Sequence, residues 1–217
     1  AAALIDFMPL RQGRIASHLV RLVVGLRGQM AMRTELVIRF GYGGWVPWVT
    51  RTDADELVAI AGPDMVVMRT PVELRGEGLK TVGDFVVNAG QQIAFVLTYS
   101  PSHLPLPEPI DVDIALRATA AFWQAWASKA RTTERYSEIL TRSLITLKAL
   151  TYAPHGGIIA APTTSLPEWI GAPRNWDYRF CWLRDATLTL LSLMNAGYFD
   201  EAKAWRDWLL RAAAGSP

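Results

Sequence analysis

Aromatic and charged side chains alternate along one short stretch, residues 174–185, in a way that suits a polar, ring-shaped ligand. The rings and charges are Trp176, Tyr178, Phe180 and Trp182, with Arg174, Asp177, Arg179, Arg184 and Asp185. Aromatic faces pack well against the C–H faces of a sugar. Arginine only donates hydrogen bonds and a carboxylate only accepts them, so the two together can recognise a pair of hydroxyl groups. Sugar binding is therefore one interpretation of these residues.

A purely structural interpretation of Arg184 and Asp185 also remains open. An acidic residue at the amino end of a helix is stabilised by the helix dipole, which would account for Asp185. Adjacent helical residues point about 100° apart, so Arg184 would pair with another neighbour, such as Asp177, rather than face to face with Asp185.

Other candidates for chemistry are weaker. The single cysteine, Cys181, lies between two aromatic residues, where burial is commoner than reactivity, and we expect an inert packing role. The segment GEGLKT at 76–81 lacks the spacing of a phosphate-binding loop and predicts a β-turn. His18, His103 and His155 lie far apart without a neighbouring ligand pattern. We therefore expect neither a metal nor a cofactor.

Composition limits the partners. The 217 residues have a net charge of +2 and no basic run, which argues against nucleic acid. No apolar run has the roughly 18 residues of a membrane span. The N-terminus does not resemble a signal peptide, and one cysteine cannot form an intrachain disulfide, so the expected location is the cytoplasm. The content of 51% hydrophobic residues, with nine tryptophans, predicts apolar surface that meets another chain or segment.

The elements that must position the aromatic segment fall into two parts, giving an α+β protein. Residues 1–100 predict an antiparallel β-sandwich, because short β-branched runs alternate with glycine and proline. The expected strands are HLVRLVVGL, MRTELVIRF at 32–40, ELVAIA, DMVVMRTPVEL, TVGDFVVN and QQIAFVLTY. Four prolines within 100–109 indicate a linker, which we place at 101–111.

Residues 112–217 change to helical periodicity. Apolar stripes predict one helix with Ile114, Ala118, Ala121, Phe122 and Ala125 on one face, and another with Tyr136, Leu140, Leu144, Leu147 and Leu150. The segment from Arg184 predicts a helix that Gly197 ends, and Asp200 is the expected N-cap of the next.

Two groups of segments resemble a known family. GGIIAAPTTSLPE and RNWDYRFCWLRDATLTLLSLMNAGYFDEAKAWRDWLLRA are similar to the beginning of the catalytic domain of bacterial glycoside hydrolase family 15. This family includes glucoamylases, glucodextranases and a trehalase-like branch. LIDFMPL and RFGYGGWVPWV resemble the β-sandwich domain that precedes it. The resemblance covers nearly the whole chain.

The resemblance implies the first helices of an (α/α)6 barrel and an inverting hydrolase of α-glucosidic bonds, acting on trehalose or on the non-reducing ends of α-glucans and dextrins. In the family pattern, Tyr–x3–Trp–x–Arg–Asp lines the pocket of the terminal glucose. By this resemblance Tyr178 and Trp182 would pack around the sugar, and Arg184 and Asp185 would bind its outer hydroxyls.

The resemblance implies no catalytic residue within this chain, since both family glutamates lie beyond residue 217. Glu168, Asp177 and Asp185 have no spacing that enforces two opposed carboxyl groups, so we do not expect them to replace the pair. The alternative is a non-catalytic fragment that binds sugar or only assembles. We expect a chain cut at both ends, with unpaired apolar stripes that include Trp205, Trp208 and Leu209 and that drive self-association.

Overall fold

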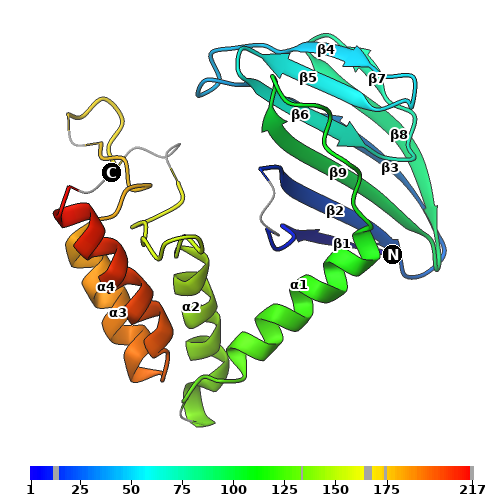
Figure 1. Ribbon diagram of the computed structural model, residues 1–217. Coiled ribbons are helices and arrows are strands. Elements are labelled where there is room, and N and C mark those ends of the chain that lie inside the picture. The colour runs from blue at the N-terminus through cyan, green and yellow to red at the C-terminus, as the bar shows by residue number, and fades with distance from the viewer. Residues whose placement is uncertain (12–14, 133, 164–167, 174, 216–217) are drawn as a thin grey trace. The chain divides into compact units, whose positions relative to one another are not determined.

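The computed structural model describes residues 1–11, 15–132, 134–163, 168–173 and 175–215 (Figure 1). The chain divides into two compact units, residues 1–121 and 122–217. The first unit contains the strands and the beginning of helix α1, and the second contains the remaining helices. This α+β composition agrees with the sequence-based prediction of strands followed by helices.

Two antiparallel sheets form the first unit. One has the order β1-β2-β9-β6-β5-β4 and the other the order β3-β8-β7. The strands are β1 Ala2–Phe7, β2 Ser17–Gly25, β3 Gln29–Leu36, β4 Trp48–Arg51, β5 Leu57–Ala61, β6 Asp64–Arg69, β7 Arg75–Glu77, β8 Lys80–Asn88 and β9 Gln92–Pro101. All pairings are antiparallel, as the short runs and turn residues predicted.

The core of this unit lies between the two sheets. Val23 pairs with Ile93 across β2 and β9, and both side chains are buried in one cluster with Phe95. The second sheet contributes Val87 and the partly buried Phe85, whose ring lies 5.4 Å from that of Phe95. Since side chains alternate along a strand, the register places these residues on one face.

The central strands of the six-stranded sheet are also buried on their opposite face. Thr98 and Val67, paired across β9 and β6, are both 0% exposed. Two hydrogen bonds hold the chain that follows β9 against this sheet. The Ser102 hydroxyl donates to the carbonyl of Gly62 at 2.7 Å, and the Arg69 side chain of β6 donates to the carbonyl of Pro107 at 2.6 Å. Burial on both faces explains why these strands are runs of apolar residues in which apolar and polar side chains alternate only in part.

The helices are α1 Val112–Ala127, α2 Ser137–Ala149, α3 Leu183–Asn195 and α4 Phe199–Ala213, with a short 3-10 turn, η1, at Glu134–Tyr136. Among the residues described, no helix is long and apolar enough to span a membrane. Asp111 caps α1 by accepting a hydrogen bond from the amide of Ile114 at 2.8 Å.

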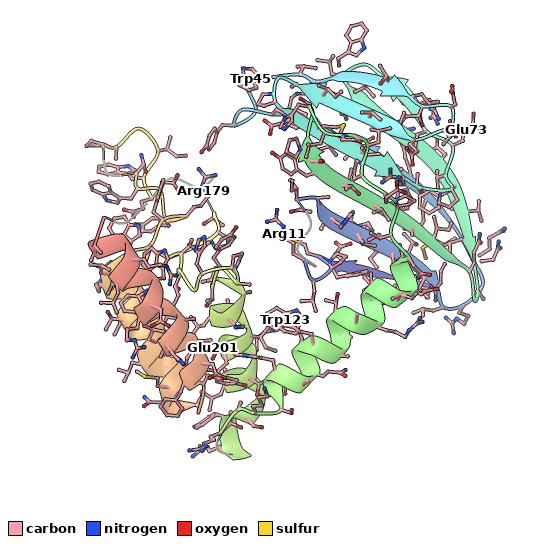
Figure 2. All side chains as sticks on the ribbon, in the orientation of Figure 1. Arg11, Trp45, Glu73, Trp123, Arg179 and Glu201 are labelled. Atoms are coloured by element: carbon pink, nitrogen blue, oxygen red, sulfur yellow. The ribbon has the colours of Figure 1, made fainter. Side chains whose placement is uncertain are left out.

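One cluster holds the helical unit together. It contains Trp126, Leu144, Leu193, Ala196 and Tyr198. The rings of Trp126 and Tyr198 stack at 4.1 Å, and the Tyr198 hydroxyl donates to the carbonyl of Trp126 at 2.7 Å. The buried Glu201, labelled in Figure 2, accepts from Trp126 Nε1 at 2.9 Å and lies 3.0 Å from Lys148 Nζ. This network joins residues of α1, α2 and α4.

Two local predictions are confirmed. Gly197 has a φ of +94° directly after the C-cap of α3, which is the left-handed conformation expected of a residue that ends a helix. GEGLKT forms the β7–β8 hairpin, in which Glu77 pairs with Lys80 and Gly78 has a φ of +62°.

Other local predictions are wrong. The N-cap of α4 is Tyr198, and Asp200 lies in the first turn of the helix. The Asp200 carboxylate therefore interacts favourably with the helix dipole but does not cap the helix. The strand expected at 32–40 is β3 at 29–36, because pairing with β8 extends it backwards to Gln29. Trp205 is not an unpaired stripe residue, since it packs against the cluster of Ile158, Ala186 and Leu190.

Candidate functional site

Main-chain hydrogen bonds hold the aromatic segment in front of α3. The amide of Ala160 donates to the carbonyl of Phe180 at 3.1 Å, and the amide of Ala161 donates to the carbonyl of Tyr178 at 2.9 Å. Ile158, just before these alanines, is only 2% exposed and packs against α3. The segment is therefore tied to a neighbouring stretch that is itself anchored in a core.

The rings of this segment form an aromatic platform, which we define as Trp176, Tyr178 and Trp182. Tyr178 stacks on Trp182 with centroids 5.6 Å apart and planes 29° apart. Trp176 meets Trp182 edge to face at 6.2 Å and 76°. Tyr178 and Trp182 are half-buried, while Trp176 is 55% exposed. Rings in this arrangement offer both a face and an edge to a ligand.

Asp177 is committed to Arg179, which Figure 2 labels. The guanidinium donates to both carboxylate oxygens, at 3.1 and 2.9 Å, and the amide of Arg179 donates to Oδ1 at 3.0 Å. These hydrogen bonds hold the pKa of Asp177 below its ordinary value, the side-chain bond from Arg179 contributing most. A carboxyl that stays ionised in this way does not act as a proton donor at neutral pH.

Arg184 and Asp185 lie in the first turn of α3. Arg184 Nη2 donates to Asp185 Oδ2 at 3.2 Å, and the two side chains are 75% and 36% exposed. An exposed pair at this distance contributes little to stability. Most donors of Arg184 face solvent, so the pair can exchange its mutual contact for hydroxyl groups of a ligand.

The structure corrects one expectation about these charges. Arg184 does not pair with Asp177, because the Arg179 guanidinium already donates hydrogen bonds to both oxygens of that carboxylate. Arg184 instead turns towards Asp185, despite their divergent directions on the helix. The predicted site residues Tyr178, Trp182, Arg184 and Asp185 thus fall into two contacting pairs, which the fold places before and at the start of α3. Arg174 lies outside the described residues.

The remaining candidates have structural surroundings. Cys181 is partly buried against the cluster of Ile158, Ala186 and Leu190, which confirms the predicted packing. His18 Nδ1 lies 3.0 Å from the Thr98 hydroxyl. His155 packs its ring against Tyr152 at 4.5 Å. Within the described ranges, no three His, Cys, Asp or Glu side chains gather as a possible metal site.

Asn175 is a residue that the sequence reasoning missed. Its Nδ2 donates to the carbonyls of Ala172 at 2.7 Å and Trp169 at 3.3 Å, so it closes the turn just ahead of the platform. The signal available in the sequence was an asparagine shortly after a Gly-Ala-Pro run, where a side-chain amide commonly satisfies a turn. Asn175 therefore fixes the chain from which the ring of Trp176 projects.

Comparisons with known proteins point to one family. Residues 134–217 match glycosyl hydrolases family 15. A trehalase of Thermoplasma volcanium is 30% identical over 201 residues, covering 92% of this chain and 32% of the relative. One of Thermoplasma acidophilum is 30% identical over 199 residues, covering 91% and 34%.

A trehalase of Mycobacterium tuberculosis is 44% identical over 85 residues, covering 39% of this chain and 12% of the relative. No solved structure matches the chain significantly. The chain spans about a third of the length of the Thermoplasma relatives. The match at 134–217 includes the platform and the Arg184–Asp185 pair, and the similarity to the Thermoplasma trehalases extends over nine-tenths of the chain. Residues 134–217 thus belong to glycosyl hydrolase family 15, and over nine-tenths of its length the chain is similar to trehalases.

Proposed function

We propose that the protein containing this chain is a glycoside hydrolase that cleaves α-glucosidic bonds, with trehalose as its first candidate substrate. Six relatives matched by the chain include trehalases from archaea and bacteria. Dextrins and other α-glucans with a non-reducing glucose are the second candidate, from the wider range of the family.

The observation that supports this proposal is the partly exposed aromatic platform, followed along the chain by the solvent-accessible Arg184–Asp185 pair, within the family segment. The platform offers apolar faces to a glucose ring. Arg184 offers donors and Asp185 acceptors, which match the two hydrogen-bonding roles of a sugar hydroxyl pair. Asp177 is already paired, so the carboxylate proposed for binding is Asp185.

The reaction itself needs two opposed carboxyl groups. An inverting glycosidase places them roughly 6.5–9.5 Å apart, one protonating the leaving oxygen and the other activating water. We propose that both come from outside residues 1–217, as the family pattern implies, and that α1 to α4 belong to an (α/α)6 barrel. The chain described here would then supply glucose binding and no proton transfer.

Turnover of trehalose, maltose and a dextrin by the longest available protein containing this chain tests the proposal. Arg184→Ala and Asp185→Ala should each lower kcat/KM for the preferred substrate by about 10- to 150-fold, the loss of one charged hydrogen bond. The ratio of the three wild-type rates decides between the two substrate candidates.

The chain contains a matched control for these variants. Arg206 and Asp207 are also adjacent on a helix, and Arg206 donates to Asp207 at 2.9 Å with side chains 64% and 41% exposed. Arg206→Ala and Asp207→Ala change the same charges in the same kind of pair, and should leave the rates within about twofold. Equal losses at both pairs, or full activity in Arg184→Ala and Asp185→Ala, would reject the site.

We also propose that the 217-residue chain self-associates and that it acts in the cytoplasm. The support for association is a set of strongly exposed apolar side chains on the helices: Ile114, Ile139, Leu183, Leu188, Leu191, Phe199 and Leu210. Apolar area of this kind favours association. Sedimentation at micromolar concentration should show oligomers, and a compact monomer would contradict this proposal without affecting the proposed activity.

A further inference from the structure

A cavity of about 430 Å³ opens at one end of the β-sandwich, within the first unit. It is lined by residues 46–51 of β4 and the chain before it, by residues 75–81 around the β7–β8 hairpin, and by the end of β3. Figure 1 shows β4 and β7 at the same end of the sheets. This volume lies within the range of roughly 300–1,000 Å³ of sites for small ligands.

The inner part of the cavity is apolar. Ala59, Leu57 and Met68 line it, and they are only 2%, 9% and 5% exposed. Val49 pairs with Ala59 and Arg51 with Leu57, so both residues of β4 point to this same face. Val49 is 46% exposed, which marks the side of the cavity that is open to solvent.

Positive charge surrounds this apolar lining. Arg39, Arg51, Arg75 and Lys80 all line the cavity, and among the described residues that line it none is Asp or Glu. Arg75 lies 2.6 Å from Asp84, and Lys80 lies 2.9 Å from Glu35. The carboxylates that pair with these two cations are therefore not part of the cavity lining. Arg51 donates to Asp55 and to the carbonyl of Leu74.

Arg39 differs from the other three cations. It donates to the carbonyls of Ile38 at 2.7 Å and Leu79 at 3.4 Å, and no carboxylate in the described part of the chain forms an ion pair with it. Its charge is therefore the one most available to an incoming anion. A guanidinium held by neutral carbonyls can add a charge-assisted hydrogen bond without first breaking an ion pair.

We propose that this cavity binds a small organic anion whose apolar body fills the inner part and whose charged head lies against Arg39. Neither half of the lining alone accounts for the arrangement, because a bare inorganic anion leaves the apolar part empty and a neutral apolar molecule leaves the cations unused. The site lies in the β-sandwich unit and does not depend on the proposed hydrolase activity.

Calorimetric titration of the whole chain with octanoate tests the proposal, with octan-1-ol and acetate as probes that each lack one half of the ligand. Octanoate should bind about tenfold or more tightly than either control. Its affinity should fall as salt is raised, since the contact is between charges near solvent. Equal affinity for octanoate and octan-1-ol, or no measurable octanoate binding, overturns the proposal.

Variants separate the two halves of the site. Arg39→Gln should weaken octanoate binding by about fivefold or more and leave octan-1-ol unaffected. Val49→Trp should fill the open side and remove octanoate binding. Arg21→Gln removes the same charge from β2, where Arg21 pairs with Asp6 outside the cavity, and should leave the affinity unchanged. Thermal melts verify that each variant folds, and unchanged octanoate binding in a folded Arg39→Gln protein overturns the assignment.

Discussion

The two units of this chain bury their apolar residues in different ways. In the β-sandwich, strand pairing fixes which side chains face the core, and the central strands of the six-stranded sheet are buried on both faces. The helical unit has smaller clusters, and large apolar side chains on α3 and α4, such as Leu188 and Leu210, remain about 60% exposed. The candidate sugar site lies in the unit with the smaller buried clusters.

Removing a large core side chain from each unit is the strongest test of this comparison. Phe95→Ala should cost about 3–5 kcal/mol, and Leu193→Ala about 2–5 kcal/mol, because each leaves a cavity in a cluster. Hydrogen exchange followed segment by segment should show Leu193→Ala releasing the helices while β2 and β9 stay protected. Equal loss of protection in both units would mean that they unfold as one.

The Glu201 network tests whether polar contacts compensate for the smaller helical clusters. Glu201→Gln keeps an acceptor for Trp126 but removes the charge opposite Lys148. The expected cost is about 1–3 kcal/mol, typical of a hydrogen bond to a charged group. Denaturant titration measures it, and Glu35→Gln, which breaks an exposed pair with Lys80, serves as the control with a much smaller effect.

Acid should weaken the helical unit through the same residue. Burial raises the pKa of Glu201, but hydrogen bonds from Trp126 and Lys148 outweigh it, so the pKa lies below its ordinary value of 4.5. A lowered pKa in the folded state adds stability above the ordinary value, and this is lost as pH falls through the folded-state pKa. Melting curves from about pH 7 to 3 should converge for wild type and Glu201→Gln; a constant gap would contradict this assignment.

The smallest expected effect concerns the site itself. Asp185 lies in the first turn of α3, so Asp185→Ala should lower stability by only about 0.3–1 kcal/mol through the helix dipole. Asp207 lies in the middle of α4, and Asp207→Ala should change stability by even less. Thermal melts compare the two, and a loss of several kcal/mol at Asp185 would indicate a structural role instead of sugar binding.

Sequence reasoning succeeded where local pattern and fold agree. The runs TVGDFVVN and QQIAFVLTY correspond to β8 and β9, because apolar and β-branched residues follow the pleat and glycines mark the turns. It missed β4 and β7, which are three or four residues long and exposed throughout. Such edge strands are defined by the neighbours with which they pair, and this information is not local.

The sequence predicted which segment forms the candidate site, but not which of its side chains contact one another. The spacing of Tyr178 and Trp182 came from a resemblance, and their stacking depends on a loop conformation that no periodicity describes. The partner of Asp177 was misjudged because a turn brings Arg179 back onto the carboxylate two residues earlier. The interpretation of Arg184 and Asp185 as ligands of sugar hydroxyls stays a prediction.

The hydrogen bonds from Ala160 and Ala161 have a consequence for how this site can change. Both are made to main-chain carbonyls, at Phe180 and Tyr178, so they place the segment without involving any ring. Exchanging one aromatic side chain for another would alter what the surface selects while the backbone beneath it kept its course. Under the proposed sugar-binding role, single substitutions of these rings would change which sugar the segment prefers while these two backbone hydrogen bonds remained.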